Sequence, residues 1–229
     1  MADVLLFDVD KTLIKTKVGH TETFFKAFKE IYGVDANIDL IEYQGKTDKQ
    51  IIIDVLKLKG LSEEKIRQRI DECMAYMVKS FREMDSRISL EKLEGVEELL
   101  NSLEKKGYLI GVVTGNIEEI GIKKLEKVGL DKYFKFGGFG NYDENRTKVL
   151  KIALKKAKKI LGPKKEYNVF YFGDTPCDIK AGLEAGITTI GVATGDYNLD
   201  ELNNSRASFV FENLKNKEEV LKVLNKNIN

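Results

Sequence analysis

The sequence of 229 residues predicts an α/β fold with a doubly wound, Rossmann-like parallel sheet, and two patterns carry this prediction. Short apolar runs, partly β-branched and bounded by glycine or aspartate, indicate buried parallel strands. Stretches with helical periodicity follow these runs, so that strands and helices alternate over most of the chain. Alternation of this kind is typical of a doubly wound α/β domain.

The strands and the helices between them can be placed by residue number. We expect strands at residues 4–7, 108–113, 167–172 and 187–192, and helices at residues 95–105, 117–128, 147–161 and 179–185.

A long insertion interrupts this alternation after the first strand. About ninety residues separate that strand from the next candidate, far more than the ~10 to 12 that a crossover requires. Helical periodicity appears within the insertion at residues 20–32, 49–58 and 62–81. We therefore expect an all-helical second domain at residues 15–88, inserted into a core made of residues 1–14 and 89–229.

The composition indicates which kinds of molecule the protein could bind. Hydrophobic residues make up 42% of the chain, enough to bury a core, and 38 Lys and Arg face 37 Asp and Glu. A net charge of +1 gives no field that would attract nucleic acid or a membrane surface, so we expect neither partner. An anionic small molecule would have to be bound by local groups. The composition leaves both a monomer and a homodimer open.

Cysteine usage and the apolar runs favour the cytoplasm. The two cysteines, Cys73 and Cys177, do not form the dense disulfide pattern of a small secreted domain, and the first residues lack a basic leader. The apolar runs are far shorter than the roughly 20 residues that a membrane helix needs. We therefore expect no transmembrane segment.

Two acids follow the first strand. In an open parallel sheet, ligands bind beyond the carboxyl ends of the strands. Asp8 and Asp10 lie at such an end, and alternation along an extended chain places both carboxylates on the same side. Burying both without a cation would be costly, so this pair indicates a metal site or an acid/base pair.

Two further strand ends add an anion site and more acids. Thr114, Gly115 and Asn116 precede a helix and offer a hydroxyl, an amide and free helix-start N–H groups to a phosphate. Asp174 and Asp178 lie at the start of another helix, at the same edge of the sheet. Several hard oxygen ligands of this kind suit Mg²⁺.

These motifs resemble a known family. The segments DVDKTL (8–13), VVTGN (112–116) and GDTPCD (173–178) are similar, in this order, to the first, second and fourth motifs of haloacid dehalogenase superfamily phosphatases. The helical insert directly after the first motif resembles the cap domain of the phosphoglycolate phosphatase-like branch. The resemblance spans most of the core and implies a Mg²⁺-dependent phosphatase that acts on a small phosphate monoester.

The resemblance also implies a role for each matching residue. Asp8 would attack phosphorus and bind the metal, while Asp10 would protonate the leaving oxygen, then activate water, and ligate Mg²⁺ through its backbone carbonyl. Thr114 would bond a phosphoryl oxygen. Asp174 would ligate the metal directly, and Asp178 would hold metal-bound water.

The third motif of the family is less clear in this chain. Family members carry a lysine just before a helix, often followed by proline, but here the segment has no proline. Arg146 lies immediately before the predicted helix and resembles a variant that uses arginine, whereas Lys148 lies two residues inside it. We favour Arg146, because either cation would offset the acids but arginine contacts phosphate through a planar fork.

Three other positions complete the expected site. Lys46, in the segment GKTDKQI (45–51), resembles part of the cap loop that helps to choose the substrate, and is a candidate to contact an acidic leaving group. Lys11 stands where many relatives have glycine, so the loop after the nucleophile is expected to be stiffer or more basic. His20 has no acid/base role once Asp10 is assigned, and we expect it on the surface of the insert.

Two alternatives stay open at this point. A sugar phosphomutase shares the motifs, and a non-catalytic phosphate-binding or interaction module could be built on the same fold. A dehalogenase is disfavoured, because dehalogenase sequences usually lack an acid at the position of Asp10.

Overall fold

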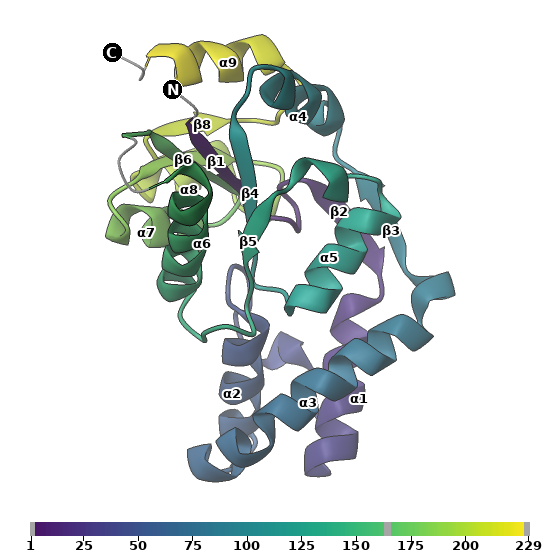
Figure 1. The fold of residues 1–229 in the computed structure, drawn as a ribbon. Helices are drawn as coiled ribbons and strands as arrows, with labels where there is room; N and C mark the ends of the chain where they lie inside the picture. Colours follow the sequence, from purple (N-terminus) through teal and green to yellow (C-terminus); the bar gives the residue numbers. More distant parts are fainter. Residues whose placement is uncertain (1–2, 163–165, 227–229) are drawn as a thin grey trace.

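A six-stranded parallel sheet forms the core of the molecule in the computed structural model, which describes residues 3–162 and 166–226. Its strand order is β5-β4-β1-β6-β7-β8, and every neighbouring pair is parallel (Figure 1). The strands are β1 (Val4–Phe7), β4 (Leu109–Val113), β5 (Phe136–Gly138), β6 (Val169–Gly173), β7 (Thr188–Val192) and β8 (Phe209–Phe211). This topology confirms the predicted α/β fold class.

Helices cover both faces of the sheet. They are α4 (Val96–Lys105), α5 (Glu118–Lys127), α6 (Arg146–Leu161), α7 (Pro176–Glu184), α8 (Leu199–Asn204) and α9 (Lys217–Lys226). Because side chains alternate along a strand, Leu5 and Phe7 of β1 pack with α4, α5 and α9, whereas Val4 and Leu6 pack with α6 and α7. The sheet is therefore a buried layer between two layers of helices, which explains why its central strands are continuous apolar runs.

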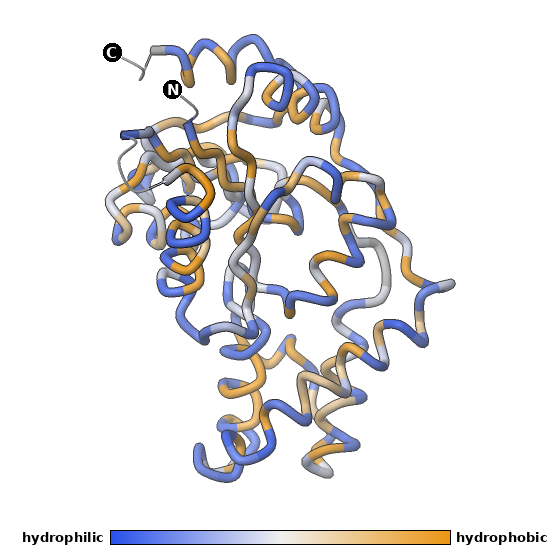
Figure 2. Tube along the Cα trace, viewed as in Figure 1, coloured by the Kyte–Doolittle hydropathy of each residue, from blue (hydrophilic) through white to orange (hydrophobic). Residues whose placement is uncertain are grey.

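A helical segment is inserted between β1 and β4. It contains α1 (His20–Tyr32), η1 (Ile38–Leu40), α2 (Asp48–Leu58), α3 (Glu63–Glu83) and η2 (Asp85–Arg87). These helices bury their own apolar cluster, to which the core contributes Ile120 of α5 and Ile117, the residue directly before α5. Figure 2 shows hydrophobic and hydrophilic residues mixed along α1, α2 and α3, as expected for helices with one buried face.

Two short strands connect this insert to the core, and the sequence did not predict them. β2 (Ile14–Val18) pairs antiparallel with β3 (Ser89–Lys92) in a separate two-stranded sheet. The expectation of an entirely helical segment from residue 15 onward is therefore wrong at its first residues. Both strands are rich in charged and polar residues, so they lack the apolar run that indicates a strand. The exact domain boundaries stay a prediction.

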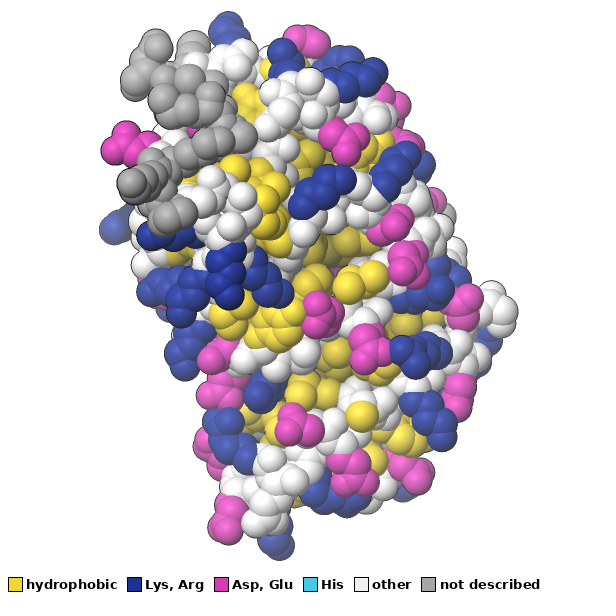
Figure 3. Space-filling view, viewed as in Figure 1, with side chains coloured by type: hydrophobic (Ala, Val, Ile, Leu, Met, Phe, Trp, Pro, Cys, Tyr) yellow, Lys and Arg dark blue, Asp and Glu magenta, His cyan; other side chains and the backbone are white. Residues whose placement is uncertain are grey.

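The surface agrees with the balanced charge of the sequence. Basic and acidic side chains are interspersed over the face shown in Figure 3. Within the residues that the structure describes, no helix is both long and apolar enough to cross a lipid bilayer.

Candidate active site

A cavity of about 120 Å³ lies at the carboxyl edge of the sheet, between the core and the insert. The core lines it with residues from three strand ends and the start of α6: Asp8, Asp10, Lys11, Thr114, Gly115, Asn116, Arg146, Asp174, Thr175 and Asp178. The insert lines it with His20, Thr21, Phe24, Ile38, Gln44, Gly45, Lys46, Asp48 and Ile51. Parallel strands bring their carboxyl ends to one edge, which is why motifs more than a hundred residues apart meet here.

Asp8 and Arg146 form the centre of the site. Asp8 directly follows β1 and is 5% exposed, and Arg146 is the first residue of α6. The Nη2 atom of Arg146 lies 2.5 Å from Oδ1 of Asp8 and 2.6 Å from Oδ1 of Asp178. Burial raises the pKa of Asp8 to about 7; Arg146 opposes this rise, whereas the carboxylates of Asp178 and Asp10 add to it.

Each nitrogen of the Arg146 guanidinium has a hydrogen-bond partner. It donates to the hydroxyl of Tyr171 from Nε at 3.2 Å and from Nη2 at 3.0 Å, and its Nη1 donates to the carbonyl of Gly45 in the insert at 3.0 Å. Tyr171 in turn donates to Oδ1 of Asp178 at 2.5 Å. A planar fork with several donors can satisfy these partners together, whereas a lysine could not.

Asp174 and Asp178 follow β6 and complete the acidic group. Asp178 forms a capping box at the start of α7, in which its Oδ2 accepts from Thr175 N at 3.1 Å and from Thr175 Oγ1 at 2.6 Å. Asp174 accepts through Oδ1 from the hydroxyl of Thr12 at 3.2 Å. Burial and the charges of Asp8 and Asp178 raise the pKa of Asp174 well above its ordinary value.

The chemistry of this acidic group suits Mg²⁺. Asp8, Asp174 and Asp178 are all buried, and Arg146 is the cation between them. Burial is the main cause of the raised pKa of Asp8 and of Asp174, and a divalent ion with oxygen ligands would favour their ionised forms. In the described part of the chain, however, no group of three or more His, Cys, Asp or Glu side chains converges on one point as in a formed metal site. The metal-binding roles of Asp8, Asp10, Asp174 and Asp178 stay a prediction.

Asp10 has an electrostatic environment opposite to that of Asp8. Its Oδ1 accepts from Thr16 at 2.9 Å and its Oδ2 from Nδ2 of Asn116 at 2.6 Å, while Nζ of Lys124 donates to both oxygens, at 2.9 and 2.7 Å. Burial opposes ionisation of Asp10, but Lys124 and His20, together with hydrogen bonds from Lys124 and Asn116, hold its pKa below its ordinary value. Asp10 is therefore ionised near neutral pH, whereas Asp8 holds its proton more tightly.

His20 and Lys124 belong to the site although the sequence did not place them there. The expectation that His20 lies on the surface of the insert is wrong: its side chain is 14% exposed and lines the cavity. Its Nδ1 lies 3.1 Å from Nζ of Lys124, and its Nε2 lies 3.3 Å from Oδ2 of Asp48 without forming a hydrogen bond. Lys124, in the middle of α5, is fully buried.

Thr114, Gly115 and Asn116 form the floor of the cavity. Oγ1 of Thr114 accepts from Nδ2 of Asn116 at 2.6 Å, and Gly115 O accepts from the backbone N–H of Asp48 at 2.7 Å. A Cβ atom on Gly115 would lie 2.2 Å from the carbonyl oxygen of Lys46, so the loop of the insert contacts this floor backbone to backbone. Glycine is required here by close approach rather than by chemistry.

The other lysines discussed from the sequence, Lys46, Lys148 and Lys11, lie in different positions relative to the cavity. Lys46 lines the cavity, with its Nζ 2.8 Å from Oδ2 of Asp54 on α2. Lys148 does not line it: its side chain is 66% exposed, and its Nζ lies 3.4 Å from Oδ2 of Asp143. Lys11 adopts a left-handed backbone conformation, with φ of 62°, and its ammonium pairs with Asp196.

Comparisons with known proteins show the family of the chain. A family model described as Haloacid dehalogenase-like hydrolase matches residues 5–192. Pyrophosphatase PpaX of Halalkalibacterium halodurans is 32% identical over 190 residues, which cover 82% of this chain and 81% of that protein. Phosphoglycolate phosphatase of Aquifex aeolicus is 30% identical over 194 residues, covering 81% and 82%.

A solved structure shows the same fold at lower identity. A beta-phosphoglucomutase of Clostridium difficile superimposes with a TM-score of 0.70 at 18% identity, covering 100% of this chain and 99% of that one. The motifs at the strand ends, the topology of the sheet and the family match over most of the sequence lead to one assignment: the chain belongs to the haloacid dehalogenase-like hydrolases.

Proposed function

We propose that the protein is a Mg²⁺-dependent phosphatase that hydrolyses a small phosphate ester through an aspartyl-phosphate on Asp8. One observation carries the proposal: Asp8 and Asp10, two residues apart, face one cavity in opposite electrostatic surroundings, and Arg146 contacts Asp8. A buried carboxylate beside a cation suits a nucleophile, and a neighbouring carboxyl in a hydrogen-bonded network suits an acid/base.

The first chemical step forms the phosphoenzyme. A carboxylate oxygen of Asp8 attacks phosphorus, and the bond between phosphorus and the leaving oxygen breaks. The negative charge of a bound phosphate favours the protonated form of Asp10, which takes up a proton on substrate binding and gives it to the leaving oxygen. The guanidinium of Arg146 and the hydroxyl of Thr114 would stabilise charge on the phosphoryl oxygens. Gly115 and Asn116 support this position from the floor of the cavity.

The second step hydrolyses the intermediate. Asp10, now a carboxylate, removes a proton from water, and the resulting oxygen attacks phosphorus. The bond between Asp8 and phosphorus breaks, inorganic phosphate leaves, and Asp8 returns to its carboxylate form. Splitting one difficult displacement into two steps is the advantage of covalent catalysis. A bound Mg²⁺, held by Asp8, Asp174 and the backbone carbonyl of Asp10, with Asp178 behind, would neutralise charge on the phosphoryl group.

The insert side of the cavity favours a small, acidic leaving group. The volume of about 120 Å³ leaves little room beyond a phosphoryl group and a short substituent. Lys46 from the insert has one carboxylate partner, Asp54, and could exchange it for an anionic group of the substrate. The names of two relatives, a pyrophosphatase and a phosphoglycolate phosphatase, refer to substrates that both carry such a group. We expect the enzyme to act in the cytoplasm, as a monomer or a homodimer.

Turnover of p-nitrophenyl phosphate with Mg²⁺ tests the class of function, and a panel of esters tests the substrate. The panel contains pyrophosphate, phosphoglycolate and sugar phosphates. Release of inorganic phosphate that is lost in the Asp8→Asn variant would support the proposal. Interconversion of sugar phosphates without net release of phosphate would instead identify a phosphomutase. Phosphate binding without any turnover would identify a non-catalytic module.

A further inference from the structure

Among the lysines that the structure describes, Lys124 alone is fully buried, with 0% of its surface exposed. Lysine is almost never fully buried unless it is paired, because the ammonium loses its hydration. Lys124 lies on the inner face of α5, beside Ile120 and Gly121 of the preceding turn, and not in a motif of the family resemblance. The mechanism above gives it no role.

The ammonium of Lys124 contacts three residues of the site. It donates to Oδ1 and Oδ2 of Asp10, at 2.9 and 2.7 Å, and to Oδ1 of Asn116 at 2.7 Å, and it lies 3.1 Å from Nδ1 of His20. Asn116 also donates to Oδ2 of Asp10 at 2.6 Å. Lys124 and Asn116 therefore fix the plane of the Asp10 carboxyl through both of its oxygens.

Lys124 contacts Asp10 from behind the lining of the cavity. Asp10 and Asn116 line the cavity, whereas Lys124 does not. An apolar side chain of similar length would fill this place in α5 without the cost of burying a charge. The contribution that only a cation makes here is its pair of contacts with Asp10.

We propose that Lys124 is a positioning residue that orients the carboxyl of Asp10 toward the leaving oxygen. The inference rests on the proposed phosphatase function and assigns a residue that the motifs do not include. Without Lys124, each oxygen of the Asp10 carboxyl keeps one donor, Thr16 on Oδ1 and Asn116 on Oδ2, and loses its second. The carboxyl is then held less firmly, so that its proton is delivered less accurately.

The chemistry of the leaving group distinguishes this role from simple support of the fold. A poor leaving group such as phenolate needs a proton from Asp10, whereas p-nitrophenolate leaves with little help. Misplacement of Asp10 should therefore slow phenyl phosphate much more than p-nitrophenyl phosphate. General damage to the site should slow both substrates equally.

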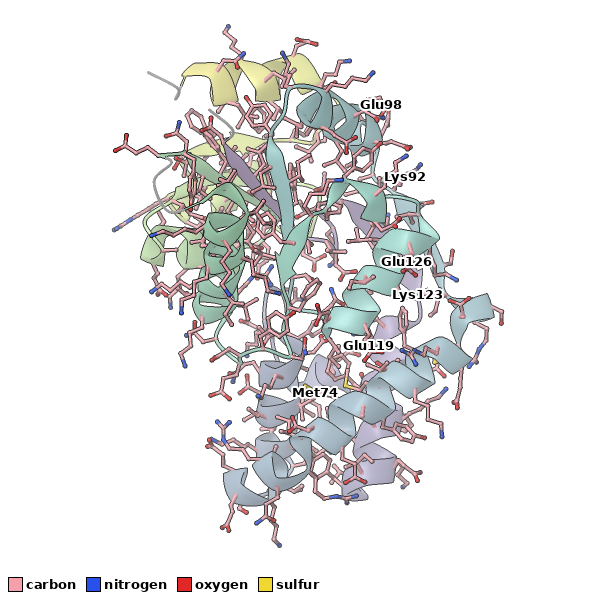
Figure 4. All side chains as sticks on the ribbon, viewed as in Figure 1. Met74, Lys92, Glu98, Glu119, Lys123 and Glu126 are labelled. Carbon is pink, nitrogen blue, oxygen red and sulfur yellow. The ribbon has the colours of Figure 1, made fainter. Side chains whose placement is uncertain are left out.

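The test compares Lys124→Met with Lys123→Met. Lys123 is the neighbouring lysine on α5; its side chain is 43% exposed and pairs with Glu126. Figure 4 labels Lys123 and Glu126 on this helix. We expect Lys124→Met to lower kcat/KM about 100-fold with phenyl phosphate and only about three-fold with p-nitrophenyl phosphate, within the range of general acid catalysis. Lys123→Met should match the wild type with both substrates.

A double variant provides an independent readout. If Lys124 acts through Asp10, Lys124→Met should add almost no further loss in the Asp10→Asn background, because residues that act as a unit are not additive. Equal losses with both substrates, or full additivity with Asp10→Asn, would overturn the proposal. If Lys124→Met does not unfold cooperatively, Lys124→Gln replaces it, and failure of both variants to fold would assign Lys124 a purely structural role. Wild-type protein inactive on both aryl phosphates would refute the phosphatase function itself.

Discussion

Replacement of Arg146 by alanine should be far more damaging than replacement of Lys148. The side chain of Arg146 is 9% exposed and lies between two buried carboxylates, at 2.5 and 2.6 Å. Removing one partner of a buried ion pair costs about 3 to 5 kcal/mol, because the remaining charge is left uncompensated. Loss of a cation that stabilises the transferring group costs on the order of 10²-fold or more in turnover.

Lys148 provides the matched control within the same helix. Its side chain is 66% exposed and its partner Asp143 lies 3.4 Å away, so the pair contributes less than about 1 kcal/mol. We expect Lys148→Ala to stay within a few-fold of wild-type turnover. Arg146→Lys should recover only part of the activity, since an ammonium cannot meet Asp8, Asp178 and Gly45 together.

The assay measures p-nitrophenyl phosphate turnover at saturating Mg²⁺ and urea unfolding of the same samples. Reading both quantities separates a loss of catalysis from a loss of folded protein. A large loss in Lys148→Ala with near wild-type turnover in Arg146→Ala would refute the reasoning and would assign the third motif to Lys148.

Three further predictions follow from the acidic cluster. EDTA should abolish turnover, Mg²⁺ should restore it and Ca²⁺ should restore it poorly, because Ca²⁺ takes a larger and more flexible shell; full activity without divalent metal would contradict this. Asp8→Asn should prevent formation of a phosphoenzyme, whereas Asp10→Asn should slow protonation of the leaving group and hydrolysis of the intermediate, as trapping with labelled substrate would show. In metal-free protein, Asp8 has a pKa of about 7 when folded against 3.8 when unfolded, so the native state keeps a proton that the unfolded chain has lost, and stability falls as pH rises through 7. Between pH 6 and pH 8 the titration of Asp8 alone should lower the free energy of unfolding by about 1.4 kcal/mol, and the raised pKa of Asp174 acts in the same direction; an increase in urea titrations would contradict the assignment.

The sequence predicted the strands that are buried on both faces and missed those that are not. The predicted ranges 4–7, 108–113 and 187–192 contain β1, β4 and β7, and the range 167–172 overlaps all of β6 but its last residue, Gly173. Helices on both sides of these strands demand an apolar residue at nearly every position. The edge strands β5 and β8 have three residues each, too short for a pattern. The polar strands β2 and β3 lie outside the main sheet and need no apolar run.

The acids of the candidate site could be anticipated because they directly follow predicted strands. Lys124 could not be found in the same way, since it lies on a helix and comes from no strand end. The sequence did contain a signal for Lys124. One buried helical face is indicated by the spacing of Ile117, Ile120, Gly121, Lys124 and Leu125. A lysine within such a face needs a buried partner. Only the tertiary structure shows that this partner is Asp10.

The backbone contact at Gly115 has a consequence for how substrate choice can change. The carbonyl of Lys46 occupies the space that a methyl group on Gly115 would need, so the loop of the insert and the floor of the core are shaped against each other. A methyl group at Gly115 would clash with the carbonyl of Lys46 and displace the loop from the proposed phosphoryl site. Substitutions of side chains in the loop, such as that of Lys46, can therefore change specificity without moving the backbone. The backbone path of the loop, in contrast, depends on Gly115, which lies in a different part of the sequence.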